Sequence, residues 1–115
     1  MTSLTTHILD TASGKPAANV AVRLYDCRSG RTLCAERCTN TDGRTEAPLL
    51  AGDALKTGCY ELEFDVGEYF QRAGAKTSEP PFLDTVVIRV SLVAGGRYHV
   101  PLLVSPWSYS TYRGS

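Results

Sequence analysis

The segment RYHVPLLVSPWSYSTYRGS, residues 97–115, decides the fold of this chain. It is the densest run of strand-forming residues in the sequence, and it continues to the last residue, although chain ends are usually polar and frayed. The period of two that a β-strand imposes places an apolar set on one face: Tyr98, Val100, Leu102 and Val104. The other face carries His99, Pro101 and Leu103. The first set predicts a surface that faces the core, so His99 is expected on the outer face among apolar neighbours.

Similar alternation upstream predicts more short strands. We expect them at residues 4–9, 20–25, 33–39, 59–65 and 85–93, with a last strand from residue 107 onward. Asn40-Thr41-Asp42-Gly43 predicts a tight hairpin turn, because Asp-Gly suits the positive φ angles of such turns. EYFQRAG, residues 68–74, predicts one short helix, because its apolar residues have helical spacing and Gly74 suits a helix end.

This pattern favours an all-β fold. Turn signals recur roughly every ten residues, and strands do not alternate with helices, which is typical of an antiparallel β-sandwich. The sequence has no internal repeat, low-complexity segment or linker. Residues 1–115 are therefore expected to form a single domain, and this length is sufficient for a hydrophobic core of its own.

The charge balance excludes some classes of function. Twelve basic and twelve acidic residues give a formal net charge of zero. Nucleic acid is not an expected partner, because its binding needs a basic surface. The first ten residues, MTSLTTHILD, do not resemble a signal peptide, and no apolar run is long enough to span a bilayer. We therefore expect a cytoplasmic protein with no membrane partner.

The four cysteines are expected to be free thiols. They are Cys27, Cys34, Cys38 and Cys59. An even number would suggest disulfides in a secreted chain, but a cytoplasmic chain keeps its thiols reduced. Cys34 and Cys38 have no histidine nearby and no second pair at the spacing of a structural zinc site, so no metal site is predicted. A redox role of the thiols stays open.

The two histidines, His7 and His99, are the best candidates for chemistry. Each lies in a predicted strand, on the face opposite to the core set, and an apolar residue or a proline follows two positions later. One such histidine is most often solvated or hydrogen-bonded to a neighbour. Two of them on a shared surface would form an acid–base pair near neutral pH. Arg44 and Arg113 are either ordinary exposed arginines or ligands for a planar anion.

Other chemical motifs are missing from the sequence. It contains no G-x-S-x-G elbow and no glycine-rich phosphate loop. Glu61 and Glu63 are most simply explained as the solvent face of a strand. The residues alone thus indicate a β-sandwich with a candidate surface of two histidines and one arginine, and they do not name a substrate.

Three segments resemble the transthyretin-like family. They are THILDTASGKPAANVAV at residues 6–22, GCYELEFDVGEYFQRAG at residues 58–74, and the carboxyl-terminal segment at residues 97–115. The ending YRGS, residues 112–115, is similar to that of the family's enzymatic branch, which hydrolyses 5-hydroxyisourate. In the hormone-carrier branch, lysine, glutamate and threonine occupy the positions that match His7, Arg44 and His99. The resemblance covers nearly the whole chain and favours the hydrolase branch.

The resemblance implies an antiparallel sandwich of two four-stranded sheets with one short helix, and a homotetramer built as a dimer of dimers. The outer faces that carry the histidines would line a channel between the dimers. The implied reaction converts 5-hydroxyisourate, the product of urate oxidation, to 2-oxo-4-hydroxy-4-carboxy-5-ureidoimidazoline without a metal or organic cofactor. The implied catalytic residues are His7, Arg44, His99 and Ser115. The implied substrate-binding residues are Tyr112, Arg113 and Gly114.

The chain departs from the family pattern only outside these positions. Residues 78–83, SEPPFL, differ from the expected aromatic–proline run, and residues 27–38 are unusually rich in cysteine. Trp107-Ser108 replaces the more usual Phe or Tyr followed by Gly. Two other functions remain to be weighed: a non-catalytic carrier with the same fold, and an immunoglobulin-like adhesion domain. His7, Arg44, His99 and the YRGS ending argue against the first, and the absence of a signal peptide argues against the second.

Overall fold

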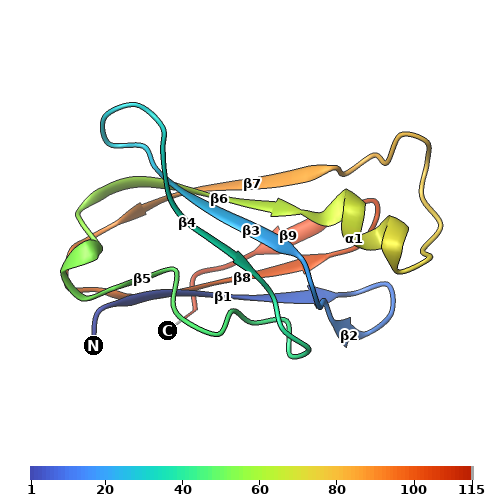
Figure 1. The fold of residues 1–115 in the computed structure, drawn as a ribbon, viewed down its shortest axis with the longest axis horizontal. Helices are drawn as coiled ribbons and strands as arrows, with labels where there is room; N and C mark the ends of the chain where they lie inside the picture. The colour runs from blue at the N-terminus through green and yellow to red at the C-terminus, as the bar shows by residue number, and fades with distance from the viewer. Residues whose placement is uncertain (115) are drawn as a thin grey trace.

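The computed structural model describes residues 1–114 and contains two facing β-sheets, with one short helix at one end (Figure 1). The first sheet contains β1 (Ser3–Asp10), β2 (Lys15–Pro16), β5 (Leu50–Ala51), β8 (Arg97–Val104) and β9 (Tyr109–Thr111). The second sheet contains β3 (Ala21–Asp26), β4 (Thr32–Cys38), β6 (Gly58–Asp65) and β7 (Thr85–Leu92). Helix α1 (Val66–Arg72) follows β6, and a single 3₁₀ turn, η1 (Gly52–Ala54), follows β5.

The expected all-β sandwich with one short helix is confirmed, and two details of the first sheet differ from the expectation. This sheet has five strands instead of four, in the order β2-β1-β8-β9 with β5 also paired to β1. Strands β2 and β5 have two residues each, which is too short for an alternating pattern to predict them. In addition, β1 and β8 are parallel, whereas the other pairs are antiparallel among the strands described. Alternation predicts which face is buried but carries no information on strand direction.

The core lies between the two sheets and consists of the predicted inward residues. On β6, the side chains of Tyr60, Leu62 and Phe64 are 1%, 0% and 0% exposed. On β8, Val100, Leu102 and Val104 are 4%, 0% and 1% exposed. Each fully buried side chain of this size contributes about 1.5–3 kcal/mol to folding by leaving water. The burial fixes the register of both sheets, because a shift by one residue would expose the whole set.

Helix α1 closes one end of the sandwich. It begins at Val66, two residues before the predicted start, because Val66 and Gly67 are buried together with Phe70. The backbone N–H of Gly67 donates to the Asp84 carbonyl at 2.9 Å, which ties the start of the helix to the approach of β7. Gly74 follows the helix with a positive φ of 76°, as expected for a residue that ends a helix.

The turn at 40–43 forms, but it does not produce the predicted hairpin. The N–H of Gly43 donates to the Asn40 carbonyl at 2.9 Å, and the chain then crosses to the first sheet instead of pairing with β4. Gly43 has a φ of 76°, and its carbonyl accepts a hydrogen bond of 2.8 Å from the N–H of Ile8 on β1. A Cβ at position 43 would collide with the Ile8 carbonyl oxygen, so the close approach requires glycine. This contact brings Arg44 to the edge of β1.

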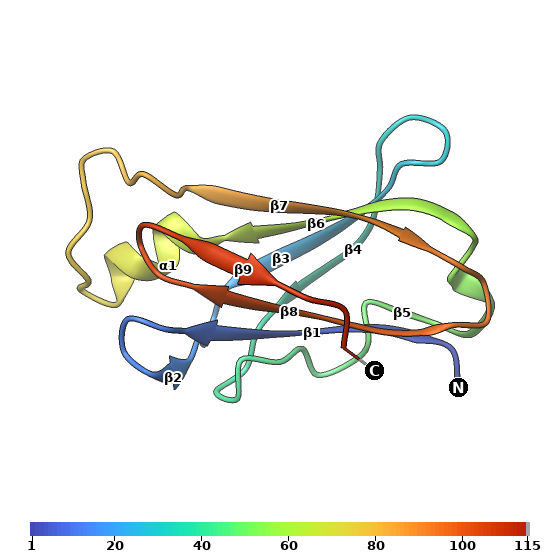
Figure 2. The same ribbon diagram turned by 180° about the vertical axis from the view of Figure 1, so that it is seen from behind.

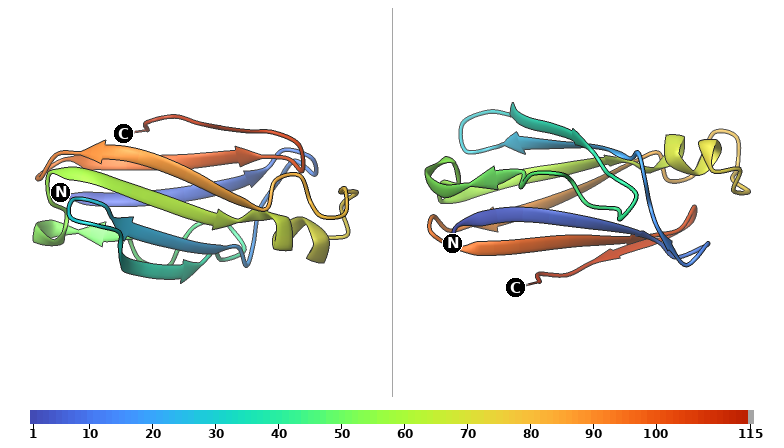
Figure 3. Two further views of the ribbon diagram at one scale, coloured as in Figure 1. Left: turned by 90° about the horizontal axis from the view of Figure 1, so that it is seen from above. Right: turned by 60° about the horizontal axis from the view of Figure 1, so that its bottom comes forward.

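The amino terminus lies at the end of the molecule opposite α1, and the described part of the carboxyl-terminal tail runs toward that end (Figure 3). Strand β9 runs antiparallel to β8 and is an edge of the first sheet; the chain then continues toward the amino-terminal end (Figure 2). Among residues 1–114, no helix is long and apolar enough to cross a membrane.

Candidate functional site

The two histidines lie side by side on the outer face of the first sheet. In the parallel pairing of β1 with β8, His7 is opposite Pro101 and His99 is opposite Thr5, so the histidines are diagonal neighbours. Their ring centroids are 6.5 Å apart, with an angle of 39° between the ring planes. Both side chains are half-buried. The two histidines thus share one surface, which places two imidazoles within the span of one small substrate.

Arg44 is the next residue across the sheet from His7. The two residues form an isolated antiparallel β-bridge, which directs their side chains to the same face. Arg44 is exposed, and it makes no ion pair with any residue in the range 1–114. Its guanidinium is therefore available for an anion or for a developing negative charge.

Gly114 lies on the opposite side, next to His99. The two residues form a second isolated antiparallel bridge, in which the N–H of Gly114 donates to the His99 carbonyl at 2.7 Å. A Cβ at position 114 would be 3.1 Å from Cδ2 and 3.2 Å from Cβ of His99. Glycine therefore lets the carboxyl-terminal tail lie directly against the imidazole. Arg44, His7, His99 and Gly114 form a continuous line across the sheet.

The surroundings of His99 favour the neutral imidazole. Burial lowers its pKa, and the positive charges of Arg44 and His7 lower it further. The Nδ1 atom is 2.8 Å from the hydroxyl oxygen of Thr5, its neighbour in the strand register. The same hydroxyl is 3.5 Å from the Tyr98 carbonyl. This contact occupies Nδ1, so Nε2 is the nitrogen available to a substrate.

An open hollow of about 490 Å³ lies beside His99. Its lining contains Met1, Ser3, Thr5, Arg44, Arg97, Tyr98 and His99. Two arginines make it suitable for a small, planar, oxygen-rich anion. Sequence reasoning missed Thr5 and Arg97. Thr5 faces outward by the same alternation that singled out His7, so the period-two pattern contained the signal that would have found it.

The remaining tail residues take other positions. Tyr112 is 61% exposed, and it lines a second hollow with Arg113 and residues of β7. The Arg113 guanidinium lies 4.8 Å from the Tyr98 ring centroid and donates to the Arg97 carbonyl at 3.3 Å. The structure therefore does not bring Tyr112 or Arg113 to the histidine pair within one chain. Ser115, also predicted as a site residue, lies outside the described residues.

Metal-binding groups do not gather at this site. Within residues 1–114, no three His, Cys, Asp or Glu side chains are arranged to hold a metal ion. The polar groups that do converge on the hollow are imidazole, guanidinium and hydroxyl groups. This set is suited to proton transfer and to the binding of negative charge.

Comparisons with known proteins agree with this arrangement. A sequence model of the HIUase/Transthyretin family matches residues 4–114. A 5-hydroxyisourate hydrolase from Ralstonia nicotianae is 54% identical over 117 residues, which cover 100% of both chains. One from Deinococcus radiodurans is 55% identical over 97% of this chain and 95% of the relative. The structure of Klebsiella pneumoniae 5-hydroxyisourate hydrolase superimposes with a TM-score of 0.81 at 37% identity, covering 100% of both chains.

The family match spans nearly all of the described residues, including both histidines, Arg44 and Gly114. The fold, with two facing sheets and one short helix, is also that of the solved relative. The chain therefore belongs to the HIUase/transthyretin family.

Proposed function

We propose that this chain hydrolyses 5-hydroxyisourate to 2-oxo-4-hydroxy-4-carboxy-5-ureidoimidazoline, a step of urate catabolism. The observation that carries the proposal is the line of Arg44, His7 and His99 on one outer face, beside an open basic hollow. The reaction needs an activated water, a proton for the leaving nitrogen and stabilisation of an oxyanion. These three side chains supply one group for each need. The named relatives support the choice of substrate.

His99 is the proposed general base. Its lowered pKa keeps the imidazole neutral at pH 7, as a base requires. If the Thr5 hydroxyl donates to the Tyr98 carbonyl, its oxygen accepts the Nδ1 proton of His99, and the lone pair of Nε2 faces the substrate. The water oxygen then attacks the acyl carbon of the substrate ring, and its proton moves to Nε2.

His7 and Arg44 are proposed to complete the reaction. Arg44 binds the carbonyl oxygen that becomes negative after the attack, and its charge also helps to keep His99 neutral. When the acyl C–N bond breaks, the leaving nitrogen takes a proton from a histidine on the same face. His7 is in a position to give it, because its ring centroid is 6.5 Å from that of His99.

The carboxyl-terminal tail is proposed to close the site. The bridge between Gly114 and His99 brings the chain within van der Waals contact of the imidazole. Ser115 follows directly and is proposed to position the water or the substrate. Tyr112 and Arg113 are proposed to bind substrate, and their location in the second hollow requires a movement of the tail or a contribution from another subunit.

A homotetramer, arranged as a dimer of dimers, is the proposed assembly. The edge strands β7 and β9 expose apolar side chains, among them Val87 at 42% and Tyr109 at 45%, and Tyr112, just after β9, is 61% exposed. Unpaired edges of this kind are suited to pairing with another chain. The outer face around His7 and His99 also carries Leu9 and Leu103, which a second pair of subunits would cover. The proposed compartment is the cytoplasm.

The decay of freshly generated 5-hydroxyisourate, followed by ultraviolet absorbance, tests the proposal. Micromolar protein is expected to accelerate the decay far above the spontaneous rate, and the product is identified by NMR. A chain without residues 112–115 is expected to lose turnover. If the intact protein binds the substrate without accelerating its decay, the chain is a carrier and the proposal is wrong. Light scattering checks the assembly, and a monomer that is fully active would contradict the channel.

A further inference from the structure

Two of the four cysteines face each other on the second sheet, far from the proposed site. Strand β3 pairs with β6 so that Asp26 is opposite Tyr60, and the next pair in this register is Cys27 with Cys59. The pairing continues to these residues, because the N–H of Cys27 donates to the Cys59 carbonyl at 2.9 Å. Both thiols are free and half-buried. Cys59 lies on the outer face, because its neighbour Tyr60 is buried in the core. Cys27 is opposite Cys59 in the register, so it lies on the same face.

The spacing of such a pair fits a disulfide. The one hydrogen bond between these directly opposite residues matches the hydrogen-bonded type of antiparallel pair, in which the Cα atoms are about 5.5 Å apart. Disulfides span Cα separations of about 4.4–6.8 Å, with the commonest values at about 5.5–6 Å. A Cα separation of about this size is compatible with a bond between the sulfur atoms of Cys27 and Cys59.

The other two cysteines are not placed in this way. Cys34 lies in a bulge, because Leu24 pairs with Ala35 and Tyr25 with Leu33. Its thiol donates to the Leu24 carbonyl at 3.4 Å. Cys38 is opposite Ala21, near the other end of the sheet. Neither residue has a cysteine as its cross-strand partner, although both are exposed. They are natural controls within the same chain.

We propose that Cys27 and Cys59 form an oxidation site that closes to an intramolecular cross-strand disulfide in the presence of a small-molecule disulfide. The thiolate of one cysteine attacks the small disulfide, forms a mixed disulfide and releases one thiol molecule. The second cysteine then attacks the protein sulfur of the mixed disulfide and releases the second thiol molecule. Both protein thiol protons end on the two released thiols, and the small disulfide is the oxidant that is reduced.

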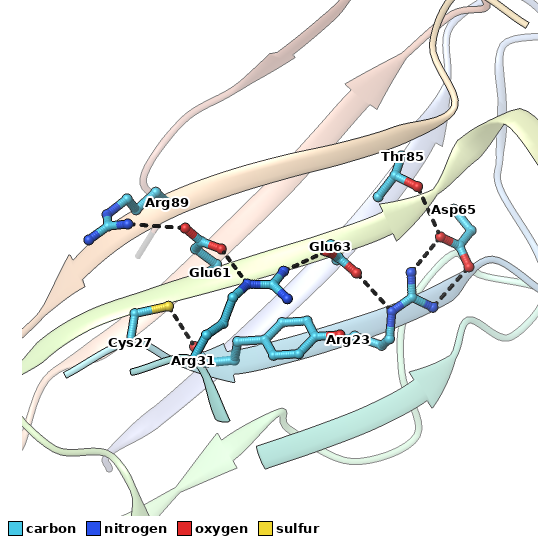
Figure 4. A network of polar contacts seen from close by, with 9 residues as sticks. Arg23, Cys27, Arg31, Glu61, Glu63, Asp65, Thr85 and Arg89 are labelled. Atoms are coloured by element: carbon cyan, nitrogen blue, oxygen red, sulfur yellow. Dashed lines mark hydrogen bonds and ion pairs between the residues drawn. The ribbon is translucent and has the colours of Figure 1, made fainter. Parts of the chain in front are cut away.

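The surroundings of Cys27 make the disulfide slow to form and resistant to reduction. Burial raises the pKa of the Cys27 thiol, and the negative charges of Glu61 and Cys59 raise it further, while Arg89 and Arg31 oppose the shift. Cys27 is therefore mostly protonated at neutral pH, which slows its attack. The same property makes Cys27 a poor leaving group when a reductant attacks the disulfide. Figure 4 shows Cys27 beside Arg31 and Glu61 on the outer face.

The disulfide is expected to stabilise the fold without changing turnover. It would join the end of β3 to the start of β6, and the closed loop would contain the whole of β4, the edge strand. Closing a loop of this length restricts the unfolded chain. The proposed site lies on the outer face of the other sheet, so its geometry is not affected.

The experiment exposes the intact protein to oxidised glutathione at mildly alkaline pH, blocks the remaining thiols and maps disulfides by non-reducing peptide mass spectrometry. A Cys27–Cys59 linked peptide pair is expected, in a chain two hydrogen atoms lighter than the reduced protein. The Tm is expected to rise by several degrees relative to the reduced protein, and to fall back after strong reduction. The rate of decay of 5-hydroxyisourate is expected to be the same in both forms.

Matched variants separate this bond from other thiol chemistry. C34S and C38S are expected to keep the rise in Tm, whereas C27S and C59S are expected to lose it and to show only glutathione adducts. The proposal is wrong if oxidised protein carries stable glutathione on both Cys27 and Cys59, or if the bond joins Cys27 to Cys34. It is also wrong if the chains become linked to one another through Cys34 or Cys38. Because the readout is a mapped bond and a Tm, the result does not depend on the proposed enzymatic activity.

Discussion

The outer faces of the two sheets differ in how their charges are satisfied. On the second sheet, arginines and carboxylates alternate and contact one another in a continuous series (Figure 4). On the first sheet, the two histidines lie among apolar residues, and Arg44 has no ion-pair partner within residues 1–114. The first arrangement is complete within one chain. The second leaves an unpaired charge and apolar surface exposed within residues 1–114, which the proposed substrate and subunits would cover.

The series on the second sheet is built from neighbouring strands. Arg23 contacts Glu63 at 2.9 Å and Asp65 at 2.6 Å, and Arg31 contacts Glu63 at 2.5 Å and Glu61 at 3.0 Å. Arg31 also lies 3.6 Å from the ring centroid of Tyr25. A group of charged residues therefore does not by itself indicate a functional site. A charged side chain that has no ion-pair partner and lies on an apolar face is a better indication. Three variants test this distinction.

The largest effect is expected for His99→Ala. Loss of the proposed base should lower kcat/KM for 5-hydroxyisourate by about 10²–10⁴-fold, because general-base catalysis contributes that much. The measurement is the initial rate of decay with freshly generated substrate. Circular dichroism and light scattering check that fold and assembly are retained. A folded His99→Ala protein with a near-normal rate would remove His99 from the mechanism.

A smaller effect, with a distinct pH dependence, is expected for Arg44→Met. The variant should lose about 10²-fold in kcat/KM, because one group that stabilises the oxyanion is missing. It also removes a positive charge that lowers the pKa of His99, so that pKa should rise toward its ordinary value near 6.5. Since the neutral imidazole is the active form, the acid limb of the pH–rate profile should move to higher pH.

Two controls sharpen this prediction. Arg44→Lys retains the charge but loses the fork geometry, so the rate should fall while the acid limb stays in place. Arg28→Met makes the same change just after β3 of the second sheet, away from both hollows, where the arginine side chain is 42% exposed, and should leave both rate and profile unchanged. An acid limb that moves equally in the lysine variant would show that charge is not the cause.

The smallest effect on activity is expected for Arg23→Met, which should change stability only. Loss of the Arg23 guanidinium should lower the free energy of unfolding by about 1.5–3 kcal/mol, as for other hydrogen bonds to charged groups. The hydrogen bonds from Arg23 hold the pKa of Asp65 below its ordinary value near 3.9. The stabilisation is therefore fully present above that value and is lost as the pH falls through the folded-state pKa. Urea unfolding at pH 7 and pH 3 checks this prediction. The difference in the free energy of unfolding between the variant and the wild type should be smaller at pH 3 than at pH 7.

The sequence predicted the buried faces and the unusual location of His99, because both follow from local alternation. A residue such as Phe64 or Leu102 has the same inward direction whichever strand lies next to it. The pairing of Arg44 with His7 was not predictable in this way. It depends on the loop after β4 crossing to the other sheet, which the contact between Gly43 and Ile8 fixes.

The course of the carboxyl-terminal tail was also only partly predictable from the sequence. A last strand was predicted from residue 107 onward, and the structure has β9 at Tyr109–Thr111 and an isolated bridge at Gly114. The local sequence of the tail could not predict that Arg113 would lie over the Tyr98 ring instead of turning toward His99. Side-chain direction beyond the last strand depends on contacts between distant segments, and the proposed subunits would add further ones.

The parallel pairing of β1 with β8 also has a kinetic consequence. Thr5 and His99, which contact each other at 2.8 Å, are 94 positions apart in the sequence. Pairing of such distant segments closes a very long loop and slows folding compared with local hairpins. The second sheet can begin from neighbouring strands, whereas the two histidines meet only after most of the chain has been synthesised and ordered. In a refolding experiment, the return of catalytic turnover should therefore lag behind the return of β-sheet signal.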